Sequence, residues 1–109
     1  MGPRTYGEFM GVYKDQYETV DAGQTDQVLG PTGGTGDRLF QLIITVATSL
    51  TGTVSIKDGS GSAIPITAAN TPIGVYSVSF GEYGARSRGG AWSVTTGAGA
   101  SVVAVGDFL

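Results

Sequence analysis

Short apolar runs separated by glycine-rich turns make up most of this 109-residue chain, and the pattern limits what it can fold into. In the longest run, residues 38–48, one series of alternate positions is Phe40, Leu42, Ile44 and Val46. Alternation with a period of two is typical of a β-strand, whose successive side chains point to opposite faces. Because the intervening positions are also largely apolar, we expect this strand to lie in the middle of a sheet.

Further runs of this kind recur about every ten residues after residue 21, a spacing typical of all-β domains. Asp58-Gly59 between two alternating runs indicates a hairpin, and Pro65 in the returning run indicates an edge strand. A chain of this size has room for one domain. About seven or eight such strands predict an all-β fold, an antiparallel two-sheet sandwich. A jelly-roll-like arrangement is favoured over an immunoglobulin-like one, because the Cys, Trp, Cys signature of the latter is missing.

Residues 1–20 differ from the rest and are predicted to form an N-terminal arm, with the sandwich domain spanning residues 21–109. The arm carries Tyr6, Tyr13 and Tyr17, three of the five tyrosines. Its apolar spacing suits one face of a short helix, but glycines inside the segment weaken that interpretation. An arm that takes shape against a partner and a strand or coil packed on its own domain both remain open.

Charge and hydropathy exclude several classes of partner. The net charge is −3, and charged residues make up 14% of the chain, against about 25% in a typical soluble domain. Binding to nucleic acid through phosphates needs a basic surface, so no nucleic-acid partner is expected. Charged residues interrupt the first twenty positions, which excludes a signal peptide, and no apolar run approaches a membrane span. We expect a soluble protein that is synthesised in the cytoplasm and has no membrane partner.

The side chains that most catalysis uses are missing, since the chain has neither histidine nor cysteine. The common catalytic triads and the usual zinc ligand sets are therefore ruled out. The nine acidic residues are dispersed, and turn-forming or solubilising roles explain most of them. We expect a protein that is not an enzyme, with no cofactor, metal site or small-molecule substrate.

Two loops and one aromatic residue have plainer interpretations than ligand binding. The glycine-rich residues 30–36 lack the Lys-Ser/Thr ending of a P-loop and lead into a strand, so they predict a connection between strands. Residues 84–90, which include Arg86 and Arg88, predict an exposed hairpin loop suited to an acidic partner. Trp92 begins an alternating run and is expected to anchor the core.

Three segments together resemble a known protein family. They are DAGQTDQVLGPTG at residues 21–33, IKDGSG at 56–61 and GGAWSVTTGAGA at 89–100. In this order they resemble the head decoration, or cement, proteins of tailed phages, over roughly residues 21–109. The resemblance implies a jelly-roll-like homotrimer on the outer face of the capsid. There it would hold major capsid protein subunits together, so the expected location is the virion.

Candidate contact residues follow from the aromatic arm and from the second face of the 38–48 strand. For contact with the capsid we expect Tyr6, Phe9, Tyr13 and Tyr17, since tyrosine is enriched at interfaces. For contact between subunits we expect Leu39, Gln41, Ile43 and Thr45. One alternative is a receptor- or glycan-binding module of a phage fibre, using Tyr83 beside Arg86 and Arg88. Another is a small hydrolase that uses carboxylates.

Overall fold

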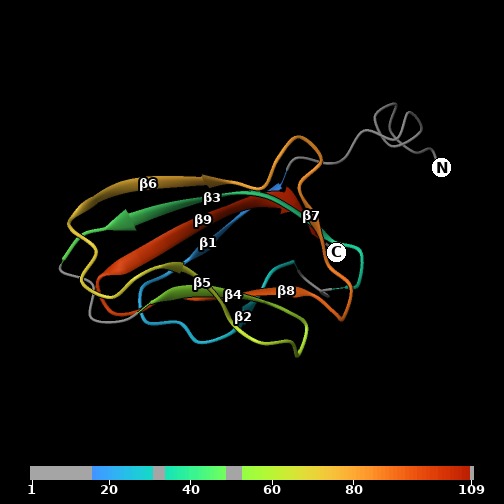
Figure 1. Ribbon diagram of the computed structural model, residues 1–109, viewed down its shortest axis with the longest axis horizontal. Helices are drawn as coiled ribbons and strands as arrows, with labels where there is room; N and C mark the ends of the chain where they lie inside the picture. The colour runs from blue at the N-terminus through green and yellow to red at the C-terminus, as the bar shows by residue number, and fades with distance from the viewer. Residues whose placement is uncertain (1–15, 31–33, 49–52, 109) are drawn as a thin grey trace.

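The computed structural model describes residues 16–30, 34–48 and 53–108, and these form two antiparallel sheets in two layers (Figure 1). The expected all-β, two-sheet sandwich is therefore confirmed. Within these ranges no helix has the length and apolar character that a membrane span requires. The strands are β1 (Gln16–Val20), β2 (Gln27–Val28), β3 (Arg38–Val46), β4 (Val54–Asp58), β5 (Ile64–Thr67), β6 (Gly74–Ser79), β7 (Ala85–Arg86), β8 (Trp92–Thr95) and β9 (Ala100–Asp107).

The strand order shows how the chain winds between the two layers. Sheet A has the order β1-β9-β3-β6, with the short β7 also pairing β3, and sheet B has the order β2-β8-β4-β5. When β7 is set aside, β1 pairs with β9, β2 with β8, β3 with β6, and β4 with β5. The pairing is therefore nested, like one long hairpin rolled over itself.

The core lies between the sheets and is built from the inward face of each strand. Leu42, Ile44 and Val46 of β3 point into it, as the alternation predicts, and β3 is flanked by β9 and β6 in the middle of sheet A. Trp92 is buried as expected, and its Nε1 donates to the carbonyl oxygens of Ala85 at 3.0 Å and of Asp37 at 3.2 Å. The predicted core strand and core anchor are both confirmed.

The inward face of β3 departs from simple alternation at its start. Leu39 pairs with Gly106 and Gln41 pairs with Val105, so Phe40 is an extra residue opposite β9. Such a bulge shifts the alternation by one position. Leu39 is consequently buried with Leu42, and the expectation that Leu39 lies on the outer face with Gln41 is wrong.

Two local predictions in sheet B are confirmed. Strands β4 and β5 form an antiparallel hairpin around Asp58-Gly59, and Gly59 has the positive φ of +60° that such a turn favours. Strand β5, which contains Pro65, lies at the edge of sheet B.

The start of the sandwich falls inside the segment predicted as an arm. Residues 16–20 form the edge strand β1, paired along its length with β9, and Val20 is fully buried. For these five positions the structure is a strand within the domain. The rest of the predicted arm, with Tyr6, Phe9 and Tyr13, lies outside the described residues.

Candidate interaction surface

The outer face of sheet A carries no charged side chain over its central rows, and we call it the sheet A face. Its members alternate with the core residues of β1, β9, β3 and β6, and the strand register sets them side by side in rows. They are Tyr17, Thr19, Ser101, Val103, Val105, Gln41, Ile43, Thr45, Val75, Ser77 and Ser79.

Valine, isoleucine, threonine and tyrosine are good strand formers, so the local sequence explains why this face is extended. The lack of charge needs another explanation, since an antiparallel sheet usually presents a polar face to water. Tyr17 is 74% exposed and Val75 is 68% exposed, at opposite margins of the face. An exposed surface with apolar side chains and no charge is typical of a contact site.

Four of the predicted contact residues meet on this face. Tyr17 pairs with Val105, which in turn pairs with Gln41, so a predicted capsid contact and a predicted subunit contact share one row. Ile43 and Thr45 occupy the next two rows. Gln41 Nε2 donates to Ser77 Oγ at 2.6 Å and joins the face across β3 and β6. Leu39 is excluded from this surface because of the bulge.

Charge reappears only at one end of the sheet A face, beyond the bulge. There Arg38 of β3 lies opposite Asp107 of β9 in the strand register on one side, and opposite Arg86 of β7 on the other. The Arg38 Nη1 donates to the carbonyl oxygen of Tyr83 at 2.9 Å. The uncharged rows are therefore bordered by a charged end.

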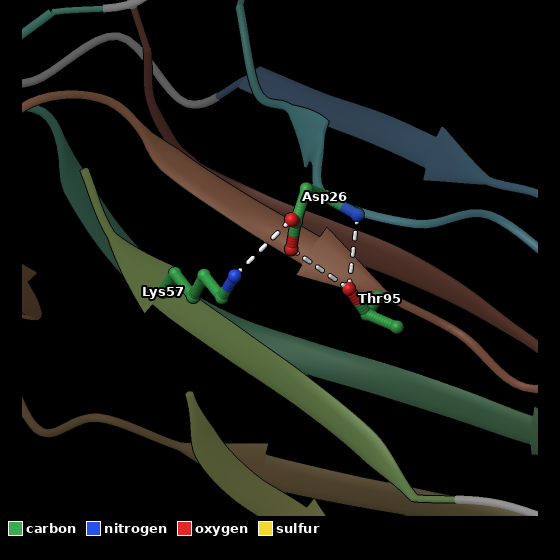
Figure 2. A network of polar contacts seen from close by, with 3 residues as sticks. All are labelled: Asp26, Lys57 and Thr95. Carbon is green, nitrogen blue, oxygen red and sulfur yellow. Dashed lines mark hydrogen bonds and ion pairs between the residues drawn. The ribbon is translucent and has the colours of Figure 1, made fainter. Parts of the chain in front are cut away.

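The outer face of sheet B differs, because it carries a polar network (Figure 2). Lys57 of β4 forms an ion pair with Asp26 at 3.1 Å, and Thr95 Oγ1 of β8 donates to Asp26 Oδ1 at 3.1 Å. The backbone N–H of Asp26 donates to the same Thr95 hydroxyl at 2.9 Å. The hydrogen bond from Lys57, followed by that from Thr95, lowers the pKa of Asp26 below its ordinary value of 3.8.

This network borders a shallow hollow, lined also by Val28, Gly59, Ser60, Ala91 and Ser93. The one carboxylate of this hollow, on Asp26, and its one ammonium group, on Lys57, already form an ion pair with each other. The arrangement joins three segments of sheet B, and this structural role accounts for all of its hydrogen bonds. Among the described residues no group of three or more acidic side chains is placed to hold a metal ion.

Residues 84–90, which we call the arginine loop, are held in place by more contacts than the sequence indicates. Arg86 and Arg88 are exposed, as expected, while Ser87 between them is buried. The Ser87 hydroxyl accepts from the N–H of Gly36 at 2.9 Å. The Asp58 carboxylate accepts from the N–H groups of Arg88 and Gly89 at 2.9 Å. The sequence around Asp58 predicts its turn but not this contact, which joins positions some thirty residues apart.

Comparisons of the chain with protein-family models, with curated proteins and with solved structures give no match.

Proposed function

We propose that this protein is a structural virion protein that decorates a phage head, binding its outer surface and stabilising contacts between major capsid subunits. The observation that carries the proposal is the sheet A face. It is broad, uncharged, and continuous across four strands. It offers contact area and hydroxyl groups, and no reactive side chain lies on it.

An uncharged face is suited to being covered by another protein. Burying a charged group costs several kcal/mol unless it is paired, whereas valine, isoleucine and tyrosine gain about 25 cal/mol per Å² buried. A specific interface of standard size buries about 1,600 Å² in total. Repeating such a contact over a closed shell adds up to a large stabilisation without any catalytic step.

The nested strand pairing supports a jelly-roll interpretation. A jelly roll has eight strands in two Greek keys, which is what results when one long hairpin is rolled into two sheets. The chain has this pairing once the two-residue β7 is set aside. The phage decoration family that the sequence resembles implies the same fold.

The proposed partners are the major capsid protein and further copies of the chain, with a homotrimer as the proposed assembly. Gln41, Ile43 and Thr45 are the proposed contacts between copies, and Tyr17 the proposed contact with the shell. The proposed location is the capsid surface of the virion.

The test is binding to empty heads of the phage that encodes the chain, measured by co-sedimentation. Ile43→Lys buries a charge where the copies are proposed to meet, at a desolvation cost that should break the trimer. Because the trimer presents several copies of Tyr17 to the shell, head binding should weaken at least about tenfold. The matched control is Ser55→Lys on the outer face of sheet B, which adds the same charge and should bind like the wild type. Equal binding by both variants would exclude this face from the function.

A second candidate, a glycan-binding module of a phage fibre, is favoured by one feature. Tyr83 is 68% exposed and lies in the loop that leads to the exposed Arg86 and Arg88. The same stretch of chain thus offers an exposed aromatic ring and two exposed arginines, side chains that suit a sugar. A glycan array separates the two proposals. A fibre module should bind a glycan, and Tyr83→Ala should abolish that binding. It should not bind empty heads.

A further inference from the structure

The free edges of the two sheets are protected unequally. An edge strand exposes unpaired N–H and C=O groups, and proteins usually protect it by shortness, proline, bulges or inward-pointing charge. Within the described residues, β1 and β6 end sheet A, and β2 and β5 end sheet B.

Three of these four edges carry such a protection. Glu18 of β1 points inward, where its carboxylate accepts from the N–H of Gly30 at 2.7 Å and from Gln27 Nε2 at 3.0 Å. Strand β2 has two residues. Strand β5 contains Pro65, and its pairing with β4 shifts register.

Strand β6 has none of these protections. It is six residues long, contains no proline or charged residue, and pairs with β3 without a register shift. In Figure 1 it forms the outermost strand of the sheet A layer. It also lies within residues 59–81, a run with no charged residue. Ile73, just before the strand, and Val75, its second residue, are each 68% exposed.

The direction of the free hydrogen-bonding groups follows from the ladder. The N–H of Phe80 donates to the carbonyl oxygen of Phe40 at 3.0 Å. Since backbone groups alternate along an antiparallel strand, the N–H groups of Val75, Ser77 and Ser79 point away from β3. No strand of the described ranges pairs with that side of β6.

We propose that β6 pairs antiparallel with β6 of a second copy of this chain, about a two-fold axis at Ser77. In that register Ser77 faces the partner's Ser77, and Val75 faces the partner's Ser79, so every outward N–H meets a carbonyl group. The contact is isologous and closes on itself. It extends sheet A across both copies by strand addition.

Charge and burial both favour a second copy as the occupant. Each chain carries a net charge of −3, so two copies repel each other, and the uncharged run is the surface where they approach at least cost. Tyr76 and Val78 pack against the core but remain partly exposed at this edge. In the pair they lie opposite the partner's Val78 and Tyr76, which continues the core between copies. The inference does not depend on phage heads, because the pairing needs only two copies of the chain. A trimer would be doubled when its three β6 edges pair with those of one second trimer about two-fold axes.

The experiment compares the mass of the wild-type chain with that of three variants by light scattering at equal concentration. Ser77→Pro removes one outward N–H and no backbone bond to β3, and Ser77→Lys places like charges directly opposite each other at the axis. Both should have half the mass of the wild type. Ser77→Ala is the matched control, because it also loses the bond from Gln41 but keeps the N–H, and it should have the wild-type mass.

Hydrogen exchange gives a second readout that does not depend on the proline variant folding. In the wild type, the amides of Val75, Ser77 and Ser79 should exchange more slowly as concentration rises, and in Ser77→Lys the amides of these three positions should exchange at one fast rate throughout. Equal masses for the wild type and folded Ser77→Lys, with fast exchange at these amides in the wild type, would overturn the proposal. The head-binding test is separate. If Ile43→Lys lost head binding while the mass ratio between the wild type and the β6 variants stayed at two, the proposed β6 pairing would stand.

Discussion

At the scale of single residues, the polar side chains of this protein mostly join segments that are far apart in sequence. Glu18 joins the two sheets at β1 and β2, and Asp58 holds the arginine loop. The Thr96 hydroxyl donates to the carbonyl oxygen of Asp21 at 2.6 Å and accepts from the N–H of Gln24. With few charged residues available, each such contact has a specific structural role.

The pKa of Asp26 makes one of these roles testable. Lys57 and Thr95 stabilise its ionised form, so its folded pKa lies below 3.8. The resulting stabilisation is present above pH 3.8 and is lost as the pH falls through the lowered pKa. Asp26→Asn should therefore be slightly less stable than the wild type at neutral pH, and the difference should shrink in acid. Urea unfolding from neutral pH to pH 2 measures this, with Glu82→Gln as control. A difference that grows in acid would contradict the assignment.

At the scale of elements, the bulge in β3 depends on a glycine in the neighbouring strand. Gly106 of β9 is buried opposite Leu39, and a Cβ added there would collide with the Arg38 carbonyl oxygen and the Phe108 ring. Gly106→Ala should thus lower the free energy of unfolding by about 1–3 kcal/mol through overpacking. Gly89→Ala is the control, because a Cβ added at Gly89 would lie 3.5 Å from its nearest neighbour, the Asp58 carbonyl oxygen, which is an ordinary contact distance. Thermal melting of both variants tests this prediction. An equal loss of stability in the two variants would show that a side chain at position 106 is tolerated beside the bulge.

The elements that sequence predicted best are those whose signals are local. Alternation located β3, and the Asp58-Gly59 turn with Pro65 located the β4–β5 hairpin and its edge. The bulge was missed because counting with a period of two assumes one partner for each residue. Phe40 is extra only with respect to β9, whose residues lie sixty or more positions away.

The sheet A face was predictable in part, for the same reason. Alternation alone placed Gln41, Ile43 and Thr45 on one surface, and composition marked Tyr17 as a contact residue. The row that Tyr17 shares with Gln41 could not be predicted, because it depends on the pairing of β1 with β9, which joins the two ends of the described chain. The unprotected edge of β6 likewise emerges only when all four edges are compared.

At the scale of the whole molecule, the boundary of the arm decides how its role is tested. Removing residues 1–20 would delete β1, and with it the buried Val20 and both bonds of Glu18. The loss from Val20 alone is about 2 kcal/mol, so weak head binding by that truncation would report damage to the fold.

Removing residues 1–15 instead keeps β1 and Tyr17 while deleting Tyr6, Phe9 and Tyr13. We expect this chain to melt near the wild-type temperature, because the strands and core described above are all retained, and to lose most of its binding to empty heads. The full chain with Tyr6, Phe9 and Tyr13 changed to serine is the matched control and should lose binding to a similar extent. Full binding by the 16–109 chain would remove the arm from the proposed mechanism and leave Tyr17, on the sheet A face, as the proposed contact with the shell.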